Sequence, residues 1–77
     1  MADPPIFYRV KLKEIVGTTV LVGWVRLVPA HSPGEAARKA QDFRQKKTPG
    51  TFPEVLDVQF DHPGPLPSEL LADQGLT

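Results

Sequence analysis

The side chains that could do nucleophilic or acid–base chemistry are few in this chain. Ser32 follows His31 directly, and Asp61 directly precedes His62. Neighbouring residues of an extended segment point in opposite directions, which is poor geometry for a nucleophile and its base. The Asp61–His62 pair lies before Pro63 in a proline-rich turn, where a histidine is usually exposed. The sequence therefore predicts a protein that is not an enzyme.

Ligand sets for metals and cofactors are missing from the sequence as well. The chain has no cysteine, and His31 and His62 lack the spacing of a zinc ligand set. Gly17 and Gly23 are isolated, so no glycine-rich loop is present to bind phosphate. We therefore expect no cofactor, no metal and no small-molecule substrate.

Ser32 is better explained as the cap of a helix. Its hydroxyl can accept from the amide of Glu35, and Glu35 can reach back to the amide of Ser32, which is a capping box. Pro33 stands at the first helical position, where a missing N–H costs nothing. Lys46 and Lys47 stand at the other end, where the helix dipole favours positive charge. These signals predict a helix over about Pro33–Lys46.

That helix presents a thin apolar face. Ala36, Ala37, Ala40 and Phe43 follow the 3.6-residue period. The alanines allow the helix to lie close to a sheet, with Phe43 as the large anchor. The charged residues opposite are interpreted as a solvated face.

Three strand patterns surround the helix. Ile6–Val16 shows period-two alternation, with Tyr8, Val10 and Leu12 on one face and basic residues on the other, and Gly17 marks the turn that follows it. Thr19–Val28 is rich in β-branched residues and apolar on both faces, so the face that meets the helix stays open. A bulge near Pro29 would reverse its phase locally. Thr51–Phe60 predicts a third strand, with Leu56, Val58 and Phe60 on one face and Val55, Asp57 and Gln59 on the other.

The order of these elements predicts the fold class. We expect an α+β fold, a three-stranded antiparallel sheet with one helix packed across it in the order ββαβ. Residues 1–5 are expected to be a flexible lead, 6–62 the single domain, and 63–77 a flexible, proline-rich acidic tail. Within the tail, Ser68 could cap a short helical turn over Glu69–Asp73.

Charge is distributed unevenly along the chain. Residues 1–47 hold nine basic and four acidic side chains, a net of +5, whereas residues 48–77 hold five acidic side chains and none that is basic. Such asymmetry can indicate contact with nucleic acid. The corresponding hypothesis is a basic strand face beside aromatic residues that grips nucleic acid by charge and stacking. Its residues are Tyr8, Arg9, Lys11, Lys13 and Arg26.

Protein binding is the hypothesis that the sequence favours over nucleic-acid binding. One helix can cover only one face of the second strand, which leaves either Val20, Val22 and Trp24 or Leu21, Val25 and Leu27 in need of a cover. Leu66, Leu70 and Leu71 of the tail could supply it, and otherwise a second copy or a target protein must. We place the protein-binding site at Val20, Val22, Trp24, Leu70 and Leu71 and expect a homodimer.

The strand–strand–helix layout also resembles a known group of proteins. Tyr8-Arg-Val10-Lys-Leu12, a second strand and then Ala30-His-Ser32-Pro-Gly-Glu35-Ala36 are similar to the DpnD/PcfM-like small proteins of mobile elements. The amino half of HicB-type antitoxins and some phage-encoded inhibitors of bacterial defence have a similar look. The resemblance covers residues 6–46 and implies a phage- or plasmid-encoded accessory or inhibitor protein. It carries over no catalytic residue.

Length and hydropathy limit the remaining choices. The 77 residues make one domain at most, and a chain this short often gains stability by oligomerising. No apolar run approaches the roughly 20 residues of a membrane span, and the first residues lack the pattern of a signal peptide. We therefore expect a cytoplasmic protein without a membrane partner.

Overall fold

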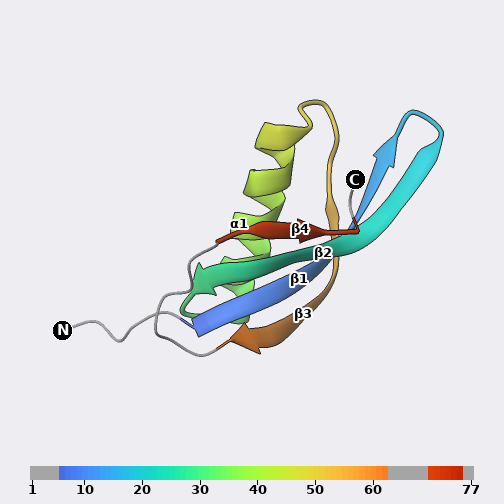
Figure 1. The fold of residues 1–77 in the computed structure, drawn as a ribbon. Coiled ribbons are helices and arrows are strands. Elements are labelled where there is room, and N and C mark those ends of the chain that lie inside the picture. Colours follow the sequence, from blue (N-terminus) through green and yellow to red (C-terminus); the bar gives the residue numbers. More distant parts are fainter. Residues whose placement is uncertain (1–5, 63–69, 76–77) are drawn as a thin grey trace.

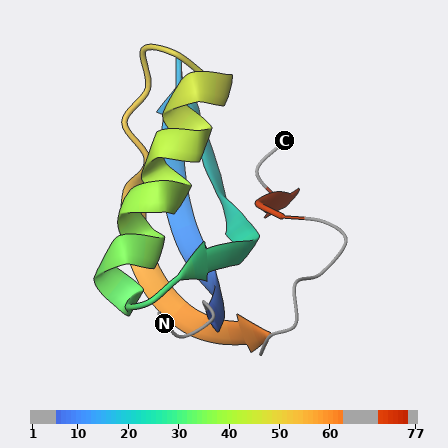
Figure 2. The same ribbon diagram turned by 90° about the vertical axis from the view of Figure 1, so that its left-hand side faces the viewer.

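The fold is a four-stranded antiparallel sheet with one helix across one face, seen in a computed structural model that describes residues 6–62 and 70–75 (Figure 1). The elements in chain order are β1 (Ile6–Val16), β2 (Thr19–Ala30), α1 (Pro33–Lys47), β3 (Glu54–His62) and β4 (Ala72–Gln74). The strand order across the sheet is β3-β1-β2-β4. Figure 2 shows that α1 covers one face of this sheet. The α+β class is confirmed, but the prediction of three strands is wrong because the tail supplies a fourth.

β1 and β2 form the central hairpin of the sheet. Their two-residue connection places Gly17 at φ 63°, the left-handed region that glycine adopts without strain. Thr18 has no positive φ, so the turn has the single positive φ at its first position that type II′ hairpins require. The bounds of β1 and the turn at Gly17 in the structure are therefore those that the sequence predicts.

A bulge in β2 decides which of its faces meets the helix. Tyr8 pairs with Val28 and Val10 with Val25, so Arg26 and Leu27 together oppose the single residue between Tyr8 and Val10. Leu27 has φ 56°, which few residues with a Cβ adopt. The extra residue shifts the alternation, so that Gly23 and Val25 before the bulge and Val28 and Ala30 after it are all buried. The bulge lies at Leu27, close to Pro29, and reverses the phase of the strand, so that Val20, Val22 and Trp24 are left on the open face.

α1 begins as its sequence predicts. Ser32 Oγ accepts from the Glu35 amide at 3.2 Å, and Pro33 occupies the first turn. One half of the expected capping box differs, because the Glu35 carboxylate accepts from the amide of His31 at 3.4 Å. α1 ends at Lys47, one residue later than predicted, and the Thr48 amide donates to the Arg44 carbonyl at 2.8 Å.

The hydrophobic core lies between α1 and the inner sheet face. Its fully buried members are Val10, Leu12, Val25, Val28, Ala30, Ala36 and Ala40. Phe43 is only partly buried, and the long side chain that α1 buries most deeply is Arg44. The expectation that Phe43 is the main anchor of the helix therefore needs correction.

β3 departs from the simple alternation expected of it. Two register shifts against β1 place extra residues at Leu56 and Asp61. Val55 and Val58 therefore both pack against the core, although the sequence placed them on opposite faces. The strand begins at Glu54, directly after the buried Pro53, which has no N–H for a ladder.

The tail residues that the structure describes form a strand instead of a helical turn. β4 pairs with Trp24, Val25 and Arg26 of β2. The helical turn predicted over Glu69–Asp73 is therefore wrong from residue 70 onward, while Ser68, Glu69 and Leu66 lie outside the described residues. An extended segment at the edge of β2 hydrogen-bonds to backbone N–H and C=O groups of that strand. An isolated helical turn would leave these groups exposed to water.

Candidate interaction surface

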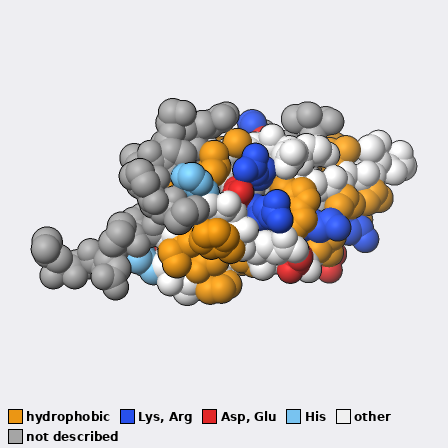
Figure 3. Space-filling view, turned by 60° about the horizontal axis from the view of Figure 1, so that its bottom comes forward, with side chains coloured by type: hydrophobic (Ala, Val, Ile, Leu, Met, Phe, Trp, Pro, Cys, Tyr) orange, Lys and Arg blue, Asp and Glu red, His pale blue; other side chains and the backbone are white. Residues whose placement is uncertain are grey.

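The open face of the sheet carries three parallel rows of side chains of different chemistry. The row on β1 is basic and consists of Arg9, Lys11 and Lys13, with Ile15 at its end. The row on β2 is apolar and consists of Val20, Val22 and Trp24. The row on β3 is acidic and polar and consists of Glu54, Asp57 and Gln59. Lys13 pairs with Val22 and Glu54, and Lys11 pairs with Trp24 and Asp57. Figure 3 shows basic and hydrophobic side chains interspersed on this face. The basic residues and the β2 residues that the sequence singled out thus share one surface, whereas Tyr8 packs against the core on the helix side and Leu70 and Leu71 lie elsewhere.

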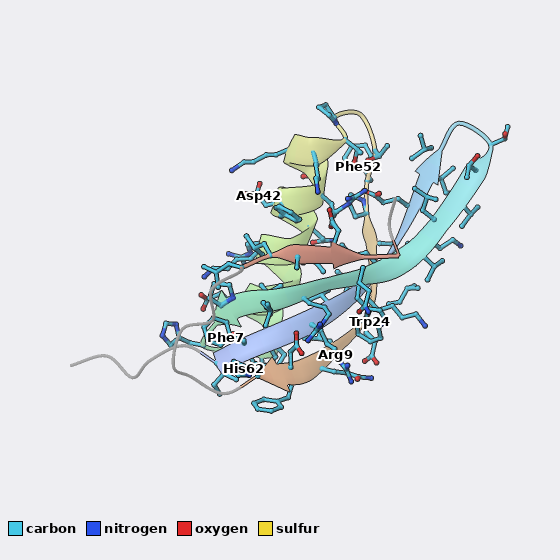
Figure 4. All side chains as sticks on the ribbon, in the orientation of Figure 1. Phe7, Arg9, Trp24, Asp42, Phe52 and His62 are labelled. Carbon is cyan, nitrogen blue, oxygen red and sulfur yellow. The ribbon has the colours of Figure 1, made fainter. Side chains whose placement is uncertain are left out.

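Trp24 is the centre of this surface, and its ring is already in contact with cations. The Arg9 guanidinium lies 5.2 Å from the ring centroid, and the Lys11 ammonium lies 5.9 Å from it. Figure 4 shows Arg9 beside Trp24. Arg9 also donates two hydrogen bonds to Gln59 Oε1, at 3.2 and 2.9 Å. A nucleobase that stacked on Trp24 would have to compete with these contacts.

Asp61 is a residue of this face whose role sequence reasoning missed. It reaches over β1 from β3, and its Oδ2 accepts from the Leu27 amide at 3.0 Å, inside the β2 bulge. The Arg26 guanidinium donates to both oxygens of the same carboxylate, at 3.2 and 2.9 Å. Burial raises the pKa of Asp61, but the hydrogen bonds from Arg26 and Leu27 and the charges of Arg26 and Arg9 leave it below its usual value. Asp61 therefore fixes the bulge that orients the apolar row.

The hairpin of β1 and β2 extends beyond its neighbours on both sides. The ladder with β3 ends at Lys13, and the ladder with β4 ends at Trp24, so residues 14–23 form a two-stranded ribbon among the described residues. Figure 1 shows this ribbon projecting past α1 and β3. The chain carries no charged residue from Ile15 to Val25.

Apolar side chains on this hairpin tip, residues 15–22, are exposed. Ile15 is 58% exposed, Val20 54%, Val22 45% and Val16 43%. A shallow hollow of about 260 Å³ adjoins the tip and is lined by Lys13, Ile15, Gly50, Thr51, Phe52 and Glu54. Phe52, labelled in Figure 4, is 83% exposed there. Contiguous exposed apolar patches of this kind are a feature that interaction surfaces of small domains share.

The edge of β3, by contrast, is protected. The Val58 amide donates to Oδ1 of Asp57 at 2.9 Å, and Gln59 Nε2 donates to Oδ2 at 2.7 Å. Bulges, acidic side chains and a satisfied edge amide are the means by which sheet edges avoid pairing. The exposed apolar residues of the hairpin tip have no such protection.

A buried ion cluster joins β1, α1 and β4 below the core. Arg44 donates to both oxygens of Glu14, at 3.2 and 2.7 Å, and to Asp73 Oδ2 at 3.0 Å. Glu14 is 0% and Arg44 2% exposed. The hydrogen bonds that Arg44 donates to Glu14, the largest of the causes, keep the pKa of Arg44 above its usual value, so the guanidinium stays charged. No local pattern in the sequence could have shown that the inward position of Glu14 in β1 faces an arginine of α1.

The remaining candidate residues lie apart from this surface. Leu71 packs against the core, and Leu70 is exposed beside it. The sequence had assigned both to one site with Val20, Val22 and Trp24, but neither of them covers those residues. Ser32 caps the helix, and His31 lies near Glu35, with 3.8 Å between Nδ1 and Oε2. His62 contacts the ring of Phe7, with 6.0 Å between ring centroids (Figure 4). Within residues 6–62 and 70–75, no group of three or more acidic or histidine side chains could hold a metal ion.

Comparison with known proteins assigns the chain to no family. No protein-family model, curated protein or solved structure matches the chain. Nor does any helix in the described part of the chain have the length and apolarity that a membrane crossing requires.

Proposed function

We propose that the chain is a small binding module that contacts a protein partner through the hairpin tip and the adjoining apolar row of the open sheet face. The observation that carries the proposal is the exposure of Ile15, Val20 and Val22 on a hairpin tip without charged residues. Burying such side chains gives about 25 cal/mol per Å² of apolar area, which favours any partner that excludes water from them. A homodimer and a target protein both satisfy this requirement.

The chemistry of the surface favours a protein over a nucleic acid. Each of Arg9, Lys11 and Lys13 has an acidic or polar residue of β3 as its lateral partner, so the basic row does not stand alone. Arg26 is paired with Asp61. Nucleic-acid binding, the alternative function, needs uncompensated charge over several phosphates. An uncharged, β-branched tip is what a protein interface supplies.

The setting of this activity comes from the resemblance to DpnD/PcfM-like proteins. On that basis the partner belongs to a phage, a plasmid or its host, and the module is an accessory or inhibitor protein acting in the cytoplasm. Because the surface is formed by strands, the partner can add a strand to the hairpin or pack a face against it.

Matched variants test the proposal. Val20→Lys with Val22→Lys places two charges on the hairpin tip, at positions that are 54% and 45% exposed. Leu56→Lys with Phe60→Lys is the control, because those side chains are 45% and 58% exposed on β3. Each immobilised chain is exposed to host lysate, and the captured proteins are quantified by mass spectrometry after nuclease treatment.

We expect the hairpin variant to lose at least about tenfold of a partner that the wild type and the control both retain, since 1.4 kcal/mol of binding energy corresponds to that factor. Circular dichroism confirms that each variant is folded. Equal capture by all three chains would contradict the proposal. Capture that disappears with nuclease and falls steeply with salt would support the nucleic-acid alternative instead.

A further inference from the structure

β4 covers one part of the outer edge of β2 and leaves the next part open (Figure 1). The ladder joins the three residues of β4 to residues 24–26 of β2, and the Leu71 amide adds a hydrogen bond of 3.2 Å to the Leu27 carbonyl. Gly75, at φ 82°, then bends the chain. Residues 19–23 of the same edge have no partner strand within the part of the chain that the structure describes. The covered edge therefore continues directly into the open edge of the hairpin tip.

Two cations of α1 form a clamp that holds a carboxylate at the covered edge. Asp73 Oδ2 accepts from Arg44 at 3.0 Å and also from Lys47. Arg44 is oriented by Glu14 of β1, with 2.7 Å between Nη2 and Oε2, so the clamp is built on β1 and α1 rather than on β4. Leu71, two residues before Asp73, packs against the core. The edge therefore fits an extended segment with an apolar residue and, two residues later, a carboxylate.

The charge of the clamp favours an acidic occupant whenever β4 is away. Arg44 and Lys47 carry two positive charges, and Glu14 supplies one negative charge beside them. Without Asp73 the clamp has an excess of one positive charge next to the buried core. A segment that brings a carboxylate to this position restores the balance through charge-assisted hydrogen bonds.

β4 occupies the edge with two unfavourable features of its own. Leu71 has φ 53°, a conformation that is strained for a residue with a Cβ. Asp73 Oδ1 is buried and has no hydrogen-bond partner among residues 6–62 and 70–75. Both features belong to the docked segment, so both are relieved when β4 leaves the edge and water reaches the carboxylate. A three-residue edge strand with these features opens more readily than the centre of the sheet.

We propose that β4 is a reversible cover of the β2 edge, which the protein partner of the hairpin tip displaces with an extended acidic segment of its own. The segment adds a strand to residues 24–27, with its carboxylate between Arg44 and Lys47, and continues along residues 19–23. Backbone hydrogen bonds to a sheet edge give such a segment affinity, and the clamp gives it specificity. The identity of the partner rests on the proposed function, whereas the opening of β4 and the preference for a carboxylate do not.

Peptide binding tests the displacement. The probe is a fluorescein-labelled peptide, Leu-Leu-Ala-Asp-Gln-Gly, which has the sequence of residues 70–75, and the control peptide has lysine in place of aspartate. The full chain carries Asp73→Lys, so that the clamp repels its own β4. The control chain carries Asp42→Lys, the same charge change at an exposed position of α1.

We expect fluorescence anisotropy to show that the acidic peptide binds the Asp73→Lys chain at least about tenfold more tightly than the Asp42→Lys chain, because only the former has an uncovered edge. The lysine peptide should bind neither chain. Acidic peptide that binds both chains alike, or lysine peptide that binds as well as acidic peptide, would overturn the proposal.

Hydrogen exchange of the wild type keeps the proposal testable if Asp73→Lys does not fold. The Leu71 amide reports on β4, and the amides of Val10 and Val25 report on the buried centre of the sheet. We expect the Leu71 amide to exchange at least about 100-fold faster than the other two, and a large excess of the acidic peptide, but not of the lysine peptide, to speed it further. A Leu71 amide that exchanges as slowly as those of Val10 and Val25, or that does not respond to the acidic peptide, contradicts the proposal.

The two proposals fail separately in these experiments. The short peptide pairs with residues 24–27, so Val20→Lys with Val22→Lys should leave its selective binding to the Asp73→Lys chain in place. Capture of host proteins that the hairpin variant does not change contradicts the proposed function alone. Peptide binding that ignores the clamp contradicts the displacement of β4 alone.

Discussion

At the residue scale, the most consequential side chains are charged groups that sequence patterns do not distinguish from surface charges. Asp61, Glu14 and Arg44 each bond to groups on another element more than 25 positions away in the chain. Their neighbours in sequence reveal nothing of those partners. Ser32, in contrast, was assigned correctly because its partner Glu35 lies only three residues away.

Acid should weaken the fold through Asp61. Because the pKa of Asp61 in the folded state lies below its unfolded value, the carboxylate contributes its full stabilisation above about pH 4 and loses it as pH falls through the folded pKa. Asp61→Asn should cost about 1–3 kcal/mol at pH 7. Urea denaturation from pH 7 to pH 2 should show a shallower acid loss for Asp61→Asn than for the wild type.

The control for this titration is Asp42→Asn, because Asp42 is an exposed carboxylate that pairs with Lys46 on the helix surface. It should leave both the stability at pH 7 and the acid slope nearly unchanged. Identical acid slopes for the wild type and Asp61→Asn would show that Asp61 does not fix the bulge of β2 as a charged group.

At the element scale, the elements defined by local signals were predictable and those defined by long-range partners were not. Hydrophobic alternation, Gly17 and the Ser32 cap identify β1, its turn and α1. A bulge near Pro29 was considered from the sequence, but its position at Leu27 and the extra residue at Leu56 could not be predicted, because they arise from pairing between strands rather than from residue type. β4 was missed for the same reason, since a three-residue strand forms only where an edge accepts it.

The ion cluster that joins three elements should behave as a unit. Arg44→Leu leaves the Glu14 carboxylate buried without its main partner, which typically costs about 3–5 kcal/mol. The double variant Glu14→Leu with Arg44→Leu removes both charges and should be more stable than Arg44→Leu alone. Chemical denaturation of the wild type, both single variants and the double variant measures this coupling.

Additive losses in that cycle would contradict the role given to the cluster. The coupling also bears on β4, because Arg44 holds Asp73 only while Glu14 orients the guanidinium. Glu14→Leu should therefore increase hydrogen exchange at β4 before it affects the buried centre of the sheet.

At the scale of the whole molecule, the two sides of the sheet have different tasks. α1 and the inner face form the core, while the outer face combines three rows of side chains with an apolar tip. The sequence indicated that β2 is apolar on both faces, although a single helix can cover only one of them. The structure shows which face is left uncovered. The sequence could not indicate that the exposed residues gather at the end of a projecting hairpin, because this depends on where β3 and β4 stop.

The central claim is that the hairpin tip contacts a protein partner. Its most direct test is a photo-crosslinking residue placed at Val20 in one chain and at Phe60 in a second, both irradiated in cells of the native host. Val20 and Phe60 are similarly exposed, at 54% and 58%, on different elements. We predict a discrete protein adduct from position 20 and none from position 60. Adducts of equal yield at both positions, or adducts from position 20 that consist of nucleic acid, would contradict the claim.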